Sequence, residues 1–505
     1  MSDRIPPPPL PGETSILDRT DVPSASHAAL GGIAALGFAF DLTFNGQRPG
    51  IAVPLLALGV ALALRRIAHR TPATDILLAS AVALSIFPSL RASVPLAAFD
   101  VLAASALFAF AATQNEGSVV VITVPGVFRR GLAVITGALE TPRFLARPLS
   151  ETAGRRRLRV TLRFLAITIP VLAIFGGLLA SGDHVFGNVL SSILPSWNVG
   201  NIVVHCIITI VGALLVAVLW RCALRREPST PALDSETPAR TPRLSFSEWF
   251  TVLAGIDLMF ATFVVIQLEY LFGGSHRVQV TPGLTYADYA RSGFAQLAVA
   301  AGLTVVVIIA AWDAGRRDHR GHERIFRTLV TALVALTAIV LASAVMRLAL
   351  YEGTFGFTIR RFFGYVAIIS IGGVLLVVLA AIWTRHRERL IAGLILVGIV
   401  AVFAINVLNP ERFVAARNVA RFHATGKIDP YYLGYELGSD ATPVVVAVLP
   451  LLSGADAAIV RKSLCHVAED LGSEPSWRSA NAGRSDARRA LGRAGITPAT
   501  CASVR

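Results

Sequence analysis

The stretch WFTVLAGIDLMFATFVVIQLEYLF (residues 249–272) decides the fold class of this protein. It holds 24 residues, of which only Asp257 and Glu269 are charged. A helix rises 1.5 Å per residue, so this stretch would extend about 36 Å, enough to cross the roughly 30 Å hydrocarbon core of a bilayer. The stretch therefore predicts a transmembrane helix.

Ten further apolar stretches, divided by arginine-rich loops, follow the same pattern. With the first stretch, they give eleven predicted spans: 28–44, 50–64, 73–90, 94–112, 160–180, 201–220, 249–272, 292–312, 328–346, 362–383 and 390–408. The second span is short and holds Pro54, so the first two could instead form a shallow helical hairpin. We predict an all-α, polytopic transmembrane helix bundle of about 11 spans with a small helical C-terminal domain.

The composition agrees with a membrane protein. Apolar residues make up 54% of the chain and charged residues 15%, whereas a soluble domain has about 25% charged residues. The mean hydropathy is +0.63. The net charge of +14 does not indicate nucleic acid, because the positive charges lie between apolar spans rather than on one face. The expected partner is the lipid bilayer, and nucleic acid is not expected.

The basic residues orient the predicted bundle. With the N-terminus inside, the cytoplasmic segments hold 26 lysines and arginines, and the loops on the other side hold 7. These cytoplasmic segments are 1–27, 65–72, 113–159, 221–248, 313–327 and 384–389, and the opposite loops are 45–49, 88–93, 181–200, 273–291 and 347–361. Positive charge is retained on the cytoplasmic side. We therefore predict a multi-pass protein of the cytoplasmic (inner) cell membrane with its N-terminus inside and, after eleven spans, its C-terminus outside.

The pattern divides the chain into five parts. We expect a disordered cytoplasmic leader (1–27), an N-terminal bundle of six spans (28–220), a flexible linker (221–248), a C-terminal bundle of five spans (249–408) and a soluble helical tail (409–505). The basic loop 113–159, inside the first bundle, has two interpretations: a helix lying flat in the headgroup region, or an ordinary basic connector.

The tail no longer has the composition of a membrane span. Asn409 and Pro410 would open an amphipathic helix that Gly426 ends, and Ser439 and Asp440 are candidate N-caps of a second helix. Shorter helices are expected near 455–471 and 475–493, and such a domain suits a protein partner. Outside the cell, Cys465 and Cys501 would meet an oxidising milieu, so they are a candidate disulfide. Two free thiols are expected instead if the topology is inverted.

Several motifs resemble a family of bacterial membrane proteins known as "domain of unknown function 4173". The run QLEYLFGG (267–274) is similar to its QLxYLFGG element, and TYADYARSGF (285–294) to its TYAxYARxGF element. MRLALYEGTFGFTIRRFFGY (346–365) matches a third element, and NPERFVAARNVAR and GKIDPYYLGYELGSDATPVV in the tail resemble two more. The resemblance implies a polytopic membrane protein with no assigned activity.

Ionisable residues inside spans are costly, so each needs a partner or a function. Asp257 falls in the cytoplasmic half of its span. The others fall in the outer half or at the outer surface. The candidate residues are Asp41, Asp100, Asp257, Gln267, Glu269, Tyr286, Asp288, Tyr289, Arg291 and Arg347. One interpretation is a polar vestibule, open to the extracytoplasmic side, that faces a ligand or a proton path. The other is a set of structural ion pairs between helices, with the tyrosines in an interfacial belt.

The sequence contains no nucleotide-binding, zinc-protease or serine-hydrolase motif, so we expect no catalytic residues, no metal site and no cofactor. His205 has no second histidine at metal-ligand spacing, and His319 and His322 lie among arginines. Enzymatic activity is therefore not favoured. Three hypotheses stay open: a scaffold or sensor that presents the exported tail, a transporter or flippase that uses Asp257, and a transferase with Asp41 or Glu269 as the base.

Overall fold

The structure is a computed structural model of the chain. It describes residues 26–46, 48–68, 70–114, 124–146, 199–224, 244–272, 286–472 and 476–502, with the single positions 168, 175 and 179. Nearly all of the predicted leader 1–27, the predicted span 160–180 except those three positions, and most of the predicted linker 221–248 lie outside the described residues.

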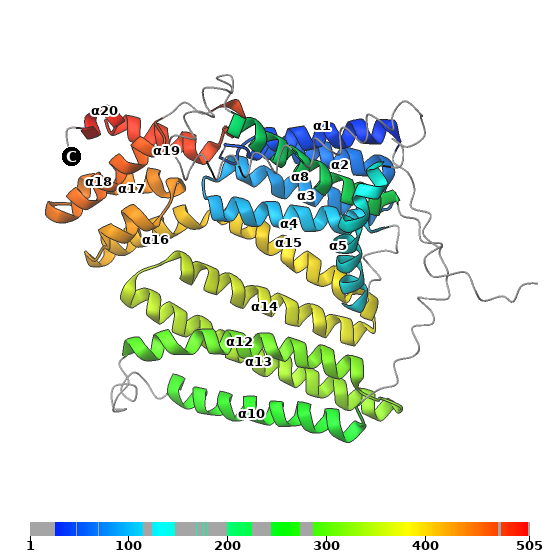
Figure 1. The fold of residues 1–505 in the computed structure, drawn as a ribbon. Coiled ribbons are helices and arrows are strands. Elements are labelled where there is room, and N and C mark those ends of the chain that lie inside the picture. The colour runs from blue at the N-terminus through cyan, green and yellow to red at the C-terminus, as the bar shows by residue number, and fades with distance from the viewer. Residues whose placement is uncertain are drawn as a thin grey trace, which may run out of the picture. The chain divides into compact units, whose positions relative to one another are not determined.

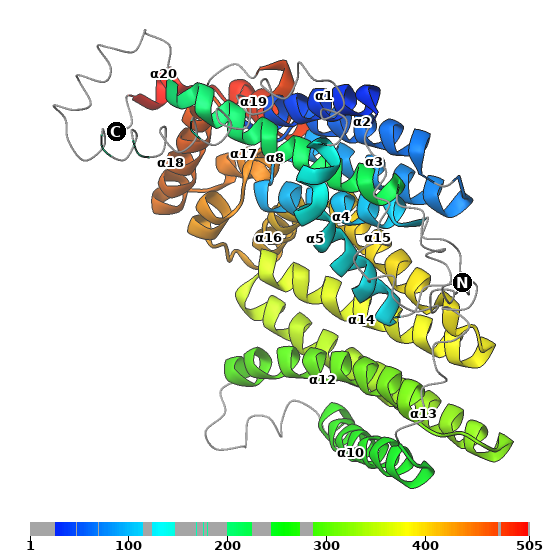
Figure 2. The same cartoon turned by 45° about the vertical axis from the view of Figure 1, so that its right-hand side comes forward.

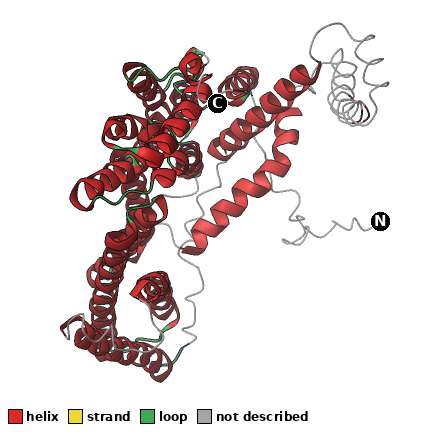
Figure 3. Cartoon of the chain, turned by 90° about the vertical axis from the view of Figure 1, so that its left-hand side faces the viewer, coloured by secondary structure: helices red, strands yellow, loops and turns green. Residues whose placement is uncertain are grey.

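The described part of the chain is built from helices, as predicted, and contains no strand (Figure 3). The helices of the bundle are α1 (His27–Phe44), α2 (Ala52–Ile67), α3 (Pro72–Leu90), α4 (Val94–Ala112), α5 (Val124–Ala146), α8 (Val199–Leu224), α10 (Phe246–Phe272), α12 (Tyr286–Ala314), α13 (Arg320–Phe355), α14 (Ile359–Thr384) and α15 (Leu390–Leu408). The tail contains α16 (Pro410–Thr425), α17 (Thr442–Val448), α18 (Gly454–Asp470), α19 (Ala482–Arg493) and α20 (Pro498–Cys501).

Eight of the described helices are long and apolar enough to cross a membrane. They are α3, α4, α8, α10, α12, α13, α14 and α15. The first two predicted spans are also helices, but α1 contributes a shorter apolar stretch (Ala28–Phe44) and α2 has 16 residues. Ten of the eleven predicted spans thus coincide with helices, and eight of these meet the length and composition of a membrane span within the described residues. The protein is a multi-pass membrane protein.

The basic loop 113–159 contains the helix α5. One stripe of this helix is strongly exposed, since Phe128, Leu132, Ile135 and Leu139 have 61–80% of their surface accessible. Residues spaced by three and four positions lie on one face of a helix. An exposed apolar stripe of this kind agrees with the interpretation of a helix that lies in the membrane surface.

The chain divides by its internal contacts into two compact units. The smaller unit comprises Met1–Asp41 and Leu132–Glu227, and the larger comprises Leu42–Gly131 and Pro228–Arg505. Within the smaller unit, α1 and α8 approach closely at two glycines. A Cβ added at Gly37 would lie 2.6 Å from the Cβ of Ala213, and one added at Gly212 would lie 2.5 Å from the Cβ of Phe40. Small residues allow such close approach between apolar helices.

The core of the larger unit is formed by α10, α12, α13 and α14, which lie side by side in two views (Figures 1 and 2). Trp249, Phe326 and Leu333 are fully buried there. The indole N–H of Trp249 donates to the carbonyl oxygen of Arg316 at 3.0 Å, so even this aromatic residue has its polar atom paired. The core is thus a continuous apolar layer between neighbouring helices.

The tail shares a second apolar core with the bundle. Val414, Leu433 and Val460 of the tail cluster with Leu96 of α4 and Ile405 of α15. The predicted helix from Pro410 is present as α16, and the C-cap glycine that ends it has the left-handed backbone (φ 70°) that glycine tolerates. Because its core includes bundle residues, the tail packs as an extension of the larger unit.

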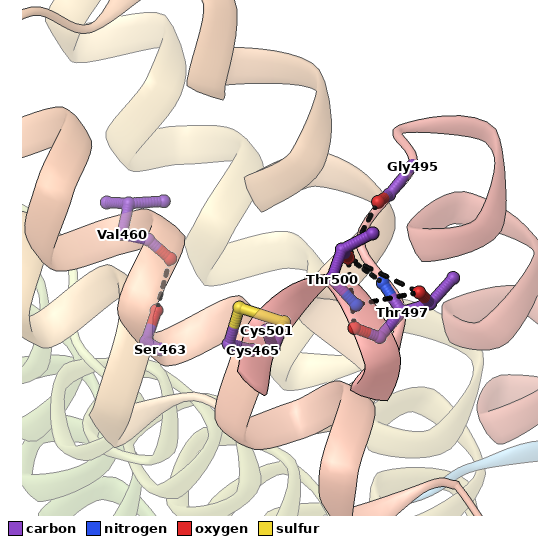
Figure 4. Close-up of a disulfide and its surroundings, with 7 residues drawn as sticks. All are labelled: Val460, Ser463, Cys465, Gly495, Thr497, Thr500 and Cys501. Carbon is purple, nitrogen blue, oxygen red and sulfur yellow. Dashed lines mark hydrogen bonds between the residues drawn. A yellow bond between two sulfur atoms is a disulfide. The ribbon is translucent and has the colours of Figure 1, made fainter. Parts of the chain in front are cut away.

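Two helices of the tail are joined by a covalent bridge. Cys465 of α18 and Cys501 of α20 form a disulfide with an S–S distance of 2.06 Å (Figure 4). Thr497 caps α20, because its hydroxyl oxygen accepts a hydrogen bond from the backbone N–H of Thr500 at 3.3 Å (Figure 4). The last described helix is therefore held both by its own cap and by the bridge.

Candidate functional site at the tail junction

The tail, residues 409–505, is bonded to three loops of the larger unit, and we call this contact region the junction. The first loop follows α1. Arg48 forms an ion pair with Asp470 of α18 at 2.5 Å, and the N–H of Ile51 donates to the carbonyl oxygen of Ala480 at 3.1 Å. An exposed ion pair contributes little by itself. The backbone hydrogen bond beside it fixes which residues of the loop and of the tail lie opposite each other.

The second loop joins α3 to α4. The side-chain amide of Asn481 donates to the carbonyl oxygens of Pro88 (2.9 Å) and Arg91 (2.7 Å). In return, the N–H of Ala92 donates to Oδ2 of Asp440 at 2.9 Å. Backbone groups at helix ends need such partners, because the helix itself leaves them unpaired. The tail therefore completes the hydrogen bonding at the end of α3.

The third loop joins α13 to α14. The N–H of Phe357 donates to Oδ1 of Asn418 at 2.9 Å, and the amide of Asn418 donates back to the carbonyl oxygen of Phe357 at 2.8 Å. The N–H of Ile359 donates to the hydroxyl oxygen of Tyr432 at 2.8 Å. This paired bonding fixes the loop on α16.

The three loops are separated along the chain, yet they lie at one end of the larger unit, where α15 passes into the tail (Figure 1). The start of α10 and the ends of α12 and α14 meet at another place: Leu244 pairs with Arg316, and Arg387 forms an ion pair with Asp313. A bundle with this alternation presents all three loops and the tail on the same side of a membrane.

Two acidic side chains lie close together at the centre of the junction. Glu411 lies in the first turn of α16, and burial together with the negative charge of Asp440 raises the pKa of Glu411 to about 7. Hydrogen bonds from Ser93 and from the backbone of Gly438 oppose this rise. A Cβ at Gly438 would lie 2.6 Å from Oε2 of Glu411, so the carboxyl group occupies the space of a side chain. Asp440 was expected as a helix N-cap, but it bonds the N–H of Ala92 instead.

Burial also raises the pKa of Asp440, which is only 4% exposed, although the bond from Ala92 and the charge of Arg91 oppose the rise. Two acids in one buried site hold their protons more strongly than either would alone. The acid pair can therefore bind or release a proton near neutral pH.

A second buried polar pair, between α4 and α15, lies next to the junction. The amide of Asn406, near the end of α15, donates to Oδ1 of Asp100 in α4 at 2.6 Å and to the carbonyl oxygen of Val402 at 3.0 Å. Asn406 and Asp100 are 0% and 1% exposed.

Three residues after Asn406, Asn409 takes the left-handed conformation (φ 52°) and caps α16 by accepting from the N–H of Arg412. The chain thus turns sharply from the span into the tail.

We expect Asn406→Ala to destabilise the larger unit by about 1–3 kcal/mol, because it leaves the buried carboxyl group of Asp100 without its donor. Thermal unfolding of the detergent-solubilised protein measures this loss. Thr337→Val is the matched control, since it removes a buried hydroxyl that bonds within its own helix. If the losses of Asn406→Ala and Asp100→Ala simply add in the double variant, the two residues are not coupled.

In the smaller unit, the structure joins the predicted Asp41 to His205. Nδ1 of His205 lies 2.6 Å from Oδ2 of Asp41, which is 1% exposed. The close approach of α1 and α8 brings the two helices together along the same face. His205, expected to pack at the interface, thus bonds a buried carboxylate.

The other predicted candidates lie on α10, α12 and α13. Ser343 donates to the side-chain oxygen of Gln267 at 3.3 Å. Neither carboxyl oxygen of Asp257 has a hydrogen-bond partner among the described residues. Arg347 lies on α13. Glu269 lies on α10 and Tyr286, Asp288, Tyr289 and Arg291 lie on α12, but the side chains of these five are outside the described part.

Neighbours of the expected vestibule make structural contacts. Arg361 lies over the ring of Tyr351 at 4.0 Å, and its guanidinium donates to the carbonyl oxygen of Gly356. Glu352 accepts from Arg417 of α16 at 2.9 Å. These contacts agree with the interpretation of structural pairs at this end of α13.

Glu411 and Asn481 were missed by reasoning from the sequence alone. Nothing in their local pattern distinguishes them from exposed helix residues. For Glu411 a usable signal existed, since NPER (409–412) and SDATP (439–443) both belong to elements that suggested a family. Charged residues in two such elements are reasonable candidates for one site.

A family comparison places these residues in context. The model of "Domain of unknown function (DUF4153)" matches residues 78–448, which is more than half of the chain. The chain belongs to the DUF4153 family. The DUF4153 region runs from within α3 to the end of α17, and therefore includes both junction acids and the Asp100–Asn406 pair. The disulfide and α19 lie beyond it.

The match confirms that the chain carries a domain of unknown function, and it does not confirm the family numbered 4173. The same comparisons find no match among curated proteins and none among solved structures. Within the described residues, no group of three histidine, cysteine or acidic side chains could hold a metal ion.

Proposed function

We propose that this DUF4153 protein is a scaffold or sensor of the cytoplasmic membrane that presents its helical tail on the extracytoplasmic side. The orientation rests on the 26 basic residues of the predicted cytoplasmic segments against 7 in the opposite loops. The Cys465–Cys501 bridge supports it, because disulfides persist in oxidising compartments. We also propose that the chain is related to the family numbered 4173, because of the motifs at 267–274, 285–294 and 346–365.

The observation that carries the proposal is the bonding of the tail to three loops. A domain that hung from α15 by a single linker would move independently of the bundle. Here Asp470, Asp440 and Asn418 each bond a different loop. A partner that shifts the tail would therefore act on the ends of α3, α13 and α14 together. This coupling suits a protein that passes a signal between an external domain and its spans.

The tail also offers a surface for a protein partner. Tyr431 and Tyr435 are 60% and 40% exposed, with ring centroids 5.0 Å apart, and Trp477 is 67% exposed. Exposed aromatic residues are enriched in protein interfaces. We propose that these side chains contact a partner of the tail.

Complementation of a deletion strain of the source organism tests this function. We expect Asp41→Asn and Asp257→Asn to restore the phenotype, and Tyr431→Ala/Tyr435→Ala/Trp477→Ala to fail at unchanged membrane abundance. Exposed surface substitutions should leave the fold intact. Leu451→Ala, an equally exposed apolar residue of the tail, is the matched control. Full complementation by the triple variant would rule out this surface.

A transporter or flippase is the second candidate, and Asp257 favours it. A buried carboxyl group without a hydrogen-bond partner in the described part of a span is costly unless it serves a ligand or a proton. This function predicts the opposite outcome in the same assay: Asp257→Asn fails at normal abundance, while the aromatic triple variant complements.

A further inference from the structure

A strongly basic surface lies where α13 begins. This helix has 36 residues, so its start lies about 54 Å from its end at the junction. The segments 313–327, which includes the loop between α12 and α13, and 384–389, between α14 and α15, together hold eight arginines and four acidic residues. Arg387 of the second segment forms an ion pair with Asp313 of the first. The two segments therefore form one surface, which we call the basic end.

The acidic residues of the basic end already have basic partners. The pairs are Asp313–Arg387, Asp318–Arg316, Glu323–Arg317, Glu323–Arg327 and Glu388–His386. Arg320, Arg324 and Arg385 are exposed, and they form no ion pair within the described part of the chain. Their positive charge is therefore available to an anion from outside the protein.

Three arginines of this surface lie on one face of α13. Arg320, Arg324 and Arg327 are spaced by four and three positions, which places them in one stripe along the helix. Thr331, one turn further, accepts a hydrogen bond from the indole N–H of Trp383 at 3.1 Å, and the guanidinium of Arg327 lies 5.7 Å from the centre of the same ring. The arginine stripe thus leads away from Trp383 at the end of α14. Arg320 and Arg324 repel each other at this spacing, and a bound anion would relieve the repulsion.

Trp383 marks the depth of the membrane surface at the basic end. It is the last residue but one of α14, a helix of membrane-spanning length, and it is 54% exposed. Tryptophan is enriched at the two surfaces of a bilayer. Arg324 lies about 10 Å beyond Thr331 along α13, and the head-group layer is roughly 5–8 Å thick. The long side chain of an arginine can bridge the difference, so the arginine stripe lies at the level of the lipid phosphates.

An exposed apolar stripe continues from Trp383 along α14. Leu376 and Ile369 precede it by seven and fourteen positions, on the same face of the helix, and are 65% and 71% exposed. Such a face suits an acyl chain, whereas a free phosphate ion would use only the arginines. The retention of positive charge on one side of a membrane explains the number of arginines, but it does not explain their alignment with this apolar stripe.

We propose that the basic end binds an anionic phospholipid, with its phosphate on Arg320 and Arg324 and an acyl chain along Trp383 and Leu376. Arg385, two residues after Trp383, adds a third positive charge. Basic clusters between membrane helices bind anionic head groups. This site does not rest on the proposed function, because neither the tail nor the junction contributes a residue to it.

Thermal unfolding of the purified, full-length protein in a neutral detergent tests the proposal. Phosphatidylglycerol is the probe. Phosphatidylcholine with the same acyl chains carries no net charge, and glycerol 3-phosphate carries the phosphate without acyl chains. A ligand that binds only the native form raises Tm. We expect a saturable rise with phosphatidylglycerol, and a half-saturating concentration at least tenfold higher with either of the other two compounds.

A paired variant locates the binding. Arg320→Gln/Arg324→Gln changes two exposed side chains and should fold. Each positive charge near an anionic lipid contributes about fivefold to the affinity, so this variant should raise the half-saturating concentration of phosphatidylglycerol at least tenfold. Arg461→Gln/Lys462→Gln is the matched control, because it removes the same charge from exposed positions of α18. The control should bind as the unchanged protein does.

Arg385→Gly gives an independent measurement. Arg385 has a left-handed backbone (φ 61°), which glycine adopts without strain. This variant should therefore keep the Tm of the protein without lipid, while it binds phosphatidylglycerol about fivefold more weakly. The proposal is overturned if phosphatidylcholine or glycerol 3-phosphate binds as tightly as phosphatidylglycerol, or if the control pair weakens binding as much as Arg320→Gln/Arg324→Gln.

Discussion

Replacing Cys465 and Cys501 with serine should lower the stability of the tail by about 3–4 kcal/mol. The bridge closes a loop with a sequence separation of 36, and the loop-entropy relation gives a value of this size for such a loop. Cys501 is buried, and α20 has only four residues. We expect residues 495–502 to become sensitive to limited proteolysis first.

Thermal unfolding of the full-length protein, with and without reductant, measures this effect. Cys206→Ser is the matched control, because Cys206 is a free, exposed cysteine of α8. The paired serine variant should lose its response to reductant, and the control should keep it. An equal response to reductant in the paired variant and in the unchanged protein would contradict the prediction.

The same bridge reports on which side of the membrane the tail lies. In a background in which Cys206 and Cys222 are serine, a membrane-impermeant maleimide should label intact cells only after reduction. Labelling without reductant would place the tail outside and argue against the bridge. Labelling only after lysis would place the tail inside and would mean that the predicted number of spans is wrong.

The junction should hold the tail more tightly at pH 5 than at pH 8. Glu411 has a pKa of about 7 in the docked structure, against 4.5 when exposed. Its protonated form therefore favours docking. The favourable contribution of Glu411 to docking is complete below about pH 4.5. It declines as the pH rises, because the detached form loses its proton first, and it is lost once the pH exceeds about 7. A shift of this size corresponds to a change on the order of 3 kcal/mol.

Hydrogen exchange of the segment around Ala92, corrected for intrinsic rates, measures docking as a function of pH. Protection of this segment should fall between pH 5 and pH 8 and should vary much less in Glu411→Gln, which stays neutral at every pH. Glu436→Gln changes an exposed acid of the same tail and serves as the control. A pH trend that is identical in Glu411→Gln would show that another group is responsible.

Most of the helices could be predicted from the sequence, because a membrane span is a local property of some twenty residues. The helix at Pro410 and its end at Gly426 were predicted for the same reason. The candidate disulfide followed instead from the predicted side of the tail, because Cys465 and Cys501 are the two cysteines of that segment. The structure brings their Cα atoms to 5.5 Å.

The candidate site could not be predicted, because its bonds join residues far apart along the chain. Asp440 follows the pattern of a helix N-cap, yet its partner Ala92 is 348 residues away. Asp100 was predicted to lie inside a span, but nothing near it in the sequence indicates Asn406, 306 residues later. Which loop a tail residue meets depends on how the spans pack, and apolar spans of similar composition do not specify their neighbours.

The long separation between bonded residues has a consequence for biosynthesis. Arg48 and Asp470 lie 422 residues apart, so at ordinary translation rates roughly 20–80 s pass between their synthesis. During that time the ends of α1 and α3 are already made, but the tail that completes their hydrogen bonds is not. The junction can form only after residues 470–484 have emerged, whichever spans have inserted before. A chain that ended before these residues would thus have loops whose backbone groups lack their tail partners. Quality-control proteases could distinguish such a bundle from the finished protein.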